Sequence, residues 1–137
     1  MLKCTRNQLH NTGNPFQGAA KKVLCVCSAG LLRSPMMANT LHKTFGFNTR
    51  AVGSCKDFAL IPISQALIWW ADEIVFANMD NFLELSQDEK DEIESVGLGK
   101  TILNIPDDFE FGDKHLEQII IQQYNSAWNN WRNNAAN

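Results

Sequence analysis

The chain has 137 residues, of which 45% are hydrophobic, and a formal net charge of -3. This length and composition suit one globular domain with a hydrophobic core of its own. The mildly acidic balance argues against nucleic acids and anionic membranes as partners, because both attract basic protein faces.

The N-terminal sequence and the cysteines indicate the compartment. MLKCTRNQLHNTGNPFQG lacks the apolar centre of a secretion signal, and no run of about 18 apolar residues occurs, so we expect a cytoplasmic protein. Its four cysteines, Cys4, Cys25, Cys27 and Cys55, are then expected to be thiols. Their spacing does not fit a zinc site, and the sequence points to no metal and no cofactor.

The chain is predicted to begin with an arm that leads into a buried strand. Residues 1–20 are rich in Asn, Gln and Gly and show no hydrophobic period, so we expect an N-terminal extension there and the folded domain over residues 21–137. The apolar run VLCVC at residues 23–27 predicts a strand that is buried on both faces, as in a parallel sheet. Cys25, inside that strand, is expected to be a core residue.

A helix is predicted soon after this strand. Ser34 is a good N-cap, and Pro35 suits the first helical position. The helix is expected over residues 36–45, with Gly46 as its C-cap.

The rest of the chain alternates strand and helix. Further strands are predicted at residues 49–52, 73–77 and 101–105, and further helices at residues 62–70, at residues 79–95 and from near Asp113 onward. Such alternation predicts an α/β fold: a three-layer, doubly wound, four-stranded parallel sheet with helices on both faces.

The loop after the first strand carries the chemistry. This candidate phosphate loop comprises Cys27, Ser28, Ala29, Gly30, Leu31, Leu32, Arg33 and Ser34. It leaves the carboxyl end of a strand, where open sheets bind ligands, and enters a helix N-terminus, whose free N–H groups bind anions. Successive loop amides can form a nest around a tetrahedral oxyanion.

Four residues of the candidate phosphate loop have side chains or backbone properties that suit phosphate chemistry. The amides, the helix dipole and a guanidinium would stabilise a Cys27 thiolate, and Ser34 could hydrogen-bond the sulfur. Gly30 can take the left-handed conformation that a tight cradle needs. Arg33 is a planar fork that can hold two phosphoryl oxygens at once. The competing interpretation is that Cys27 is a small buried hydrophobe, as most free cysteines are.

Three segments together resemble a known family. VLCVCSAGLLRSP resembles the signature of the low-molecular-weight protein-tyrosine phosphatases, WADEIV resembles the entry to their third strand, and IPDDF resembles their general-acid loop. The resemblance runs in the same order over about residues 21–125. It implies a cytoplasmic phosphomonoester hydrolase in which Cys27 is the nucleophile, Arg33 binds phosphate and Asp107 is the general acid.

The resemblance also implies a substrate and a cleft. The expected substrate is a phosphotyrosine protein or a small aryl phosphate, and inorganic phosphate or another oxyanion should bind the loop. Phe109 and Asp108 would line the substrate cleft. Asp108 stands where the family usually has proline, so the acid could be either Asp107 or Asp108. Gly30 stands where the family often has a bracing asparagine, and Leu32 stands where many members have a second cysteine.

Other functions remain open on the same sequence. Thiol-dependent arsenate reductases share this fold and loop, but their disulfide relay needs cysteines late in the chain, and none follows Cys55. A non-catalytic module could bind phosphate or a phosphoprotein without turnover. A cysteine phosphocarrier would give Arg33 no role.

Overall fold

The computed structural model describes residues 20–30, 32–57, 59, 61–106, 108–110 and 112–136, with side chains as far as residue 127. Leu31, Asp107 and almost all of the predicted N-terminal extension (residues 1–20) lie outside the described residues. No helix within these ranges is long and apolar enough to cross a membrane.

Four parallel strands form the sheet: β1 (Lys22–Cys27), β2 (Asn48–Gly53), β3 (Glu73–Phe76) and β4 (Gly99–Ile102). Their order is β2-β1-β3-β4, and every neighbouring pair is parallel. The chain winds outward from β1 to β2 and then crosses to the other side of β1, so the winding reverses between β1 and β3. Ligands of open α/β sheets bind at the carboxyl ends of the strands beside such a reversal. The candidate phosphate loop starts there.

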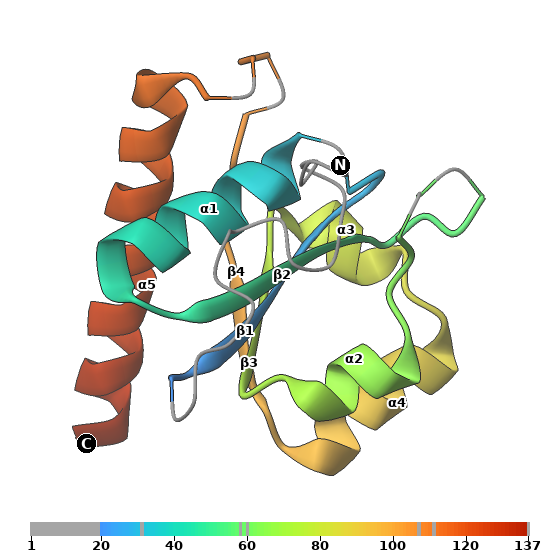
Figure 1. The fold of residues 1–137 in the computed structure, drawn as a ribbon. Coiled ribbons are helices and arrows are strands. Elements are labelled where there is room, and N and C mark those ends of the chain that lie inside the picture. Colours follow the sequence, from blue (N-terminus) through green and yellow to red (C-terminus); the bar gives the residue numbers. More distant parts are fainter. Residues whose placement is uncertain are drawn as a thin grey trace.

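Helices cover both faces of the sheet (Figure 1). Helices α1 (Arg33–Phe45) and α5 (Lys114–Ala136) pack together on one face, and α2 (Gln65–Trp70) and α4 (Gln87–Val96) pack together on the other. The short α3 (Met79–Leu83) follows the carboxyl end of β3. The predicted three-layer, doubly wound α/β fold is confirmed.

Strand β1 supplies both hydrophobic cores, because successive side chains of a strand point to opposite faces. Val23, Cys25 and Cys27 belong to the cluster under α1 and α5, whereas Leu24 and Val26 belong to the cluster under α2 and α4. All five are at most 3% exposed, and full burial of a valine or leucine contributes roughly 1.5–3 kcal/mol. Cys25 is therefore a core residue, as predicted.

Helix α1 begins earlier than the sequence predicts. Leu32 is its N-cap and makes no side-chain cap bond, so Ser34 lies inside the first turn and is not the cap. Its hydroxyl is used elsewhere: it donates to the carbonyl oxygen of Val52, 3.2 Å away. The end of the helix is as predicted, because Gly46 takes the left-handed conformation and its N–H bonds the carbonyl of His42.

The helix predicted at residues 79–95 is wrong as a single element. It is two helices, α3 and α4, and Ser86 between them has extended backbone. The Ser86 side chain accepts from the Glu89 N–H, and the Glu89 carboxylate accepts from the Ser86 N–H. This reciprocal capping box, a serine followed three residues later by a glutamate, starts a new helix.

The start of α2 and the position of β4 differ from the prediction because backbone hydrogen bonds to neighbouring segments set both. Residues 61–63 pair with Gly53, which accepts from Ile63 and donates to Ile61, so α2 begins only after its N-cap Ser64. The last strand pairs with β3 from Gly99 and is therefore displaced from the predicted residues 101–105.

Candidate active site

The candidate phosphate loop turns sharply at Gly30. This glycine has φ +75°, a conformation that costs other residues roughly 1–2 kcal/mol. A Cβ at Gly30 would also lie 2.9 Å from the Gly53 nitrogen and 3.0 Å from the Val52 carbonyl carbon. Gly30 therefore meets two requirements, a left-handed backbone and close contact with the end of β2.

The end of β2 holds the start of the loop through the backbone. The N–H of Ser54 donates to the carbonyl of Cys27 at 2.7 Å, and the N–H of Cys55 donates to the carbonyl of Ser28 at 2.9 Å. Gly53 permits this approach, since a Cβ there would lie 2.7 Å from the Ser28 oxygen. The backbone of Cys27 and Ser28 is thereby held by the two residues that follow β2.

The sulfur of Cys27 lies inside the turn and is surrounded by polar groups. The Gly30 N–H donates to Sγ at 3.2 Å, and Ser34 Oγ lies 3.2 Å from Sγ on the other side. Cys27 is 3% exposed and Ser34 is fully buried. The thiol donates to Ser34, which donates to Val52. A thiolate would require the Ser34 hydroxyl to turn and donate to sulfur instead.

Arg33 brings together two segments that the sequence analysis singled out. Its Nη1 donates to the carbonyl of Ile105 in a long hydrogen bond of 3.4 Å. Ile105 immediately precedes Pro106 and Asp107, the predicted acid loop. Asp107 lies outside the described residues, and Asp108 is exposed.

Phe109 has a mixed environment. It is partly buried against the core under α1 and α5, and its ring stacks on His115 with a centroid distance of 5.5 Å. Its role in a substrate cleft stays a prediction. Leu32 is partly buried next to Arg33, and Ser28 and Ala29 are also only partly buried.

Three polar residues that the sequence did not single out contact the loop from outside: Ser54, Asn81 and Glu84. Glu84, at the end of α3, accepts from the hydroxyls of Ser28 at 3.0 Å and Ser54 at 2.6 Å. The amide of Asn81 donates to the Ser28 oxygen at 3.0 Å. The capping box of Asn78 and Asn81 could have marked the start of α3, but no local signal points from Glu84 to the loop.

The two cysteines of β1 differ in surroundings although they are two residues apart. Burial, reinforced by the nearby Glu73 and Cys27, raises the pKa of Cys25 well above its ordinary value, so Cys25 stays a thiol. Cys27 contacts the Gly30 amide and the Ser34 hydroxyl. Among the described residues, no group of three or more His, Cys, Asp and Glu side chains could hold a metal ion.

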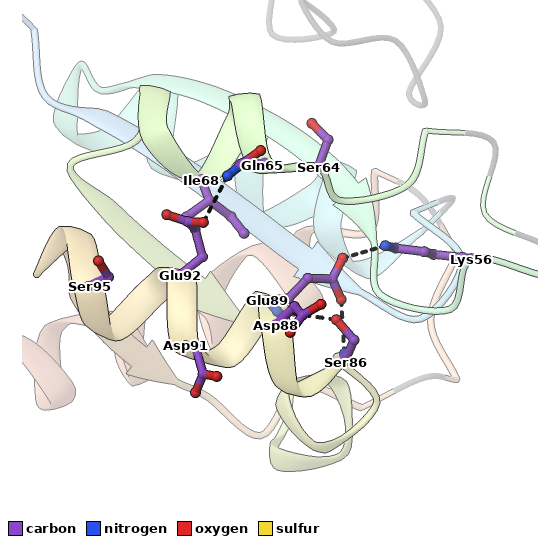
Figure 2. Close-up of a pocket in the computed structure, with 10 residues that line it drawn as sticks. All are labelled: Lys56, Ser64, Gln65, Ile68, Ser86, Asp88, Glu89, Asp91, Glu92 and Ser95. Atoms are coloured by element: carbon purple, nitrogen blue, oxygen red, sulfur yellow. Dashed lines mark hydrogen bonds and ion pairs between the residues drawn. The ribbon is translucent and has the colours of Figure 1, made fainter.

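A hollow of about 620 Å³ lies between α2 and α4, away from this chemistry (Figure 2). Lys56 reaches Glu89 there at 2.6 Å, and Glu92 accepts from Gln65 at 2.9 Å. Outside the hollow, Glu92 also accepts from Trp69 at 2.8 Å. No described residue of the candidate phosphate loop lines this hollow. Its polar groups are largely paired with one another.

Comparisons with known proteins bear on the fold. No family model matches the chain, and no curated protein matches it. Among solved structures it is similar to Vibrio vulnificus Wzb in complex with benzylphosphonate, with a TM-score of 0.55 and 19% sequence identity. The match covers 82% of this chain and 97% of the Wzb chain.

This chain has the fold of Wzb. The likeness extends over nearly the whole Wzb chain. At 19% identity the likeness concerns the fold, and the chemistry must be argued from the residues of the site itself.

Proposed function

We propose that this chain is a phosphomonoester hydrolase of the low-molecular-weight protein-tyrosine-phosphatase type, with Cys27 as its nucleophile. The observation that carries the proposal is the position of the Cys27 sulfur, 3.2 Å from both the Gly30 nitrogen and the Ser34 oxygen, at the start of α1. An amide, a hydroxyl and a helix N-terminus are groups that favour a thiolate and a bound oxyanion.

The first step is displacement at phosphorus. The Cys27 thiolate attacks in line, a sulfur–phosphorus bond forms, and the bond from phosphorus to the leaving oxygen breaks. Asp107 gives its proton to that oxygen. Arg33 and the amides of the candidate phosphate loop hold the equatorial phosphoryl oxygens, whose charge is stabilised by preorganised donors.

The second step clears the phosphocysteine. Asp107, now ionised, takes a proton from a water molecule that attacks phosphorus, and the sulfur–phosphorus bond breaks to return the thiolate and inorganic phosphate. No cofactor is required. A cytoplasmic location would keep the Cys27 thiol reduced.

The proposed substrate is an aryl phosphate, such as phosphotyrosine in a protein. Wzb was solved in complex with benzylphosphonate, which joins an aromatic ring to a phosphonate. In this chain Phe109, partly buried and stacked on His115, is an aromatic surface that could face such a ring, with Asp108 beside it.

Turnover of p-nitrophenyl phosphate tests the proposal. We expect hydrolysis by the wild type, none by Cys27→Ser, and a loss of about 10³-fold or more in Arg33→Ala, since several charge-assisted contacts in the transition state disappear. Cys55→Ser, which removes the partly buried thiol of a neighbouring loop, is the matched control and should keep full activity. Hydrolysis that survives Cys27→Ser would contradict the mechanism.

Two further assays on the same protein distinguish the phosphatase from an arsenate reductase and from a non-catalytic phosphate-binding module. Consumption of a thiol reductant that depends on arsenate, without phosphatase activity, would favour the reductase. Phosphate that protects Cys27 from alkylation, without any turnover of phosphoesters, would favour a binding module.

A further inference from the structure

We propose that Glu84 is a positioning residue of the candidate phosphate loop, acting through Ser28 and Ser54. This inference rests on the proposed function and adds a residue that lies outside the loop. Gly30 has no side chain with which to brace the loop from within. Glu84 belongs to the segment that follows β3, 56 residues after Ser28, and supplies a brace from the neighbouring strand.

The Glu84 carboxylate holds two hydroxyls that belong to different strand ends. Ser28 Oγ lies 3.0 Å from Oε1 and 3.3 Å from Oε2, and Ser54 Oγ lies 2.6 Å from Oε1. Hydrogen bonds to an ionised acceptor are stronger than those between neutral groups. The residue that follows the nucleophile and the residue that follows β2 are thereby tied to one point.

Ser28 is fixed by three separate partners. Its hydroxyl donates to Glu84 and accepts from the Asn81 amide at 3.0 Å, while its carbonyl accepts from the Cys55 N–H at 2.9 Å. Asn81 is fully buried, and its side-chain oxygen accepts from the Asn78 N–H. The only hydroxyl proton of Ser28 is directed at Glu84, so Ser28 would serve an oxyanion through its backbone N–H.

Ser54 connects Glu84 to the nucleophile itself. Its hydroxyl also lies 3.3 Å from the carbonyl oxygen of Cys27, to which its N–H donates at 2.7 Å. Ser54 is 3% exposed, so its contact with Cys27 is shielded from water, whereas Glu84 itself is exposed. Loss of the carboxylate would free Ser28 and loosen the peptide units whose N–H groups would bind the oxyanion in the proposed mechanism. A misplacement of about 1 Å in such a site can cost about 100-fold in rate.

The experiment compares three variants by steady-state hydrolysis of p-nitrophenyl phosphate and by inhibition with inorganic phosphate. We expect Glu84→Ala to lose about 10- to 100-fold in kcat/KM, mainly in kcat, and to bind phosphate more weakly. Glu84→Gln keeps an acceptor oxygen of the same size and should retain activity within about 5-fold. Asp80→Ala removes an exposed carboxylate from the same helix and should match the wild type.

A double-mutant cycle shows whether Glu84 acts through Ser28. Glu84→Ala combined with Ser28→Ala should be no slower than the worse of the two single variants, because they interrupt one connection. Effects that multiply would overturn the inference, as would wild-type kinetics in Glu84→Ala or an equal loss in Asp80→Ala.

The thermal midpoint and the affinity for phosphate distinguish a positioning role of Glu84 from a purely structural or a purely electrostatic one. A purely structural role would lower the thermal midpoint of Glu84→Ala while leaving kcat unchanged well below that midpoint, and that result overturns the inference. A purely electrostatic role would tighten phosphate binding in Glu84→Gln, because a negative charge is removed beside an anion site, and that result also overturns it. An inactive wild type would refute the proposed function, whereas an active wild type with an indifferent Glu84 would refute this inference alone.

Discussion

The hydroxyl oxygen of Ser34 lies 3.2 Å from the sulfur of Cys27, and both side chains are buried. Ser34 also donates to the Val52 carbonyl at 3.2 Å. A single hydroxyl proton cannot be given to both acceptors at full strength. The Ser34 hydroxyl therefore has two orientations, one that accepts from the thiol and one that donates to the thiolate.

Ser34→Ala removes the hydroxyl and therefore the hydrogen bond that it would donate to the Cys27 thiolate. Hydrogen bonds to charged groups contribute roughly 1.5–3 kcal/mol, so we expect kcat/KM for an aryl phosphate to fall about 10- to 100-fold. The alkylation rate of Cys27 by iodoacetamide, followed on its own peptide by mass spectrometry, should fall in parallel. Thr44→Ala, an exposed change on the same helix, is the control. Unchanged alkylation in Ser34→Ala would show that the hydroxyl does not serve the thiolate.

Gly30→Ala and Gly46→Ala form a matched pair. The two glycines have nearly the same backbone, φ +75° and φ +76°, but a Cβ meets the end of β2 at Gly30 and nothing within 4 Å at Gly46. Gly46→Ala should lose only the conformational cost, about 1 kcal/mol of unfolding free energy, and keep its activity. Gly30→Ala should lose several kcal/mol in addition to most of its activity, because backbone atoms must move.

Urea unfolding gives the unfolding free energy of both variants, and turnover of an aryl phosphate gives their activity, on the same preparations. Equal destabilisation of the two variants would mean that the loop is free to move away from Gly53, contrary to the close contact seen here.

Asp107→Ala tests the general acid. A poor leaving group needs its proton in the transition state, whereas p-nitrophenolate leaves more easily without one. We therefore expect a loss of roughly 10²–10⁴-fold for phenyl phosphate and a smaller loss for p-nitrophenyl phosphate. The measurement is the dependence of kcat on the leaving-group pKa, which should steepen in the variant. Asp108→Ala should leave it unchanged, and the reverse pattern would assign the acid to Asp108.

Glu89 should make the stability depend on acid pH. Burial acts to raise the pKa of Glu89, but the hydrogen bonds from Lys56 and Ser86 outweigh it, so the pKa lies below its ordinary value. A lowered folded-state pKa stabilises the fold at pH values above the unfolded value of about 4.3, and this contribution is lost as the pH falls through the folded value.

Urea midpoints between pH 7 and pH 3 test that sign. The wild type should lose stability on acidification, and Glu89→Gln should lose less, because it no longer takes up this proton. Glu94→Gln, on an exposed position of the same helix, should follow the wild-type curve. A Glu89→Gln curve that parallels the wild type would place the acid sensitivity elsewhere.

The alternation of strand and helix and the strand–loop–helix around Cys27 could be predicted because both are local. The apolar run of β1, the glycine at the turn and the helix after it all lie within residues 22–45, and the parallel sheet follows from right-handed crossovers between such units. The helix predicted across Ser86 failed for a local reason as well, since the capping box with Glu89 was read as helix interior.

The surroundings of the sulfur and the brace on the loop depended on the tertiary structure. The contact between Ser34 and the sulfur is predicted from the sequence and confirmed, whereas the contact of the same hydroxyl with Val52 follows from the packing of α1 against β2. Ser28 follows β1, Ser54 follows β2, and Glu84 ends the helix α3 that follows β3; they meet because the three parallel strands end at the same edge of one sheet. The sequence thus determined which residues could do the chemistry, while contacts between residues 30 to 56 positions apart decided how they are held, since no local pattern records which strand ends become neighbours.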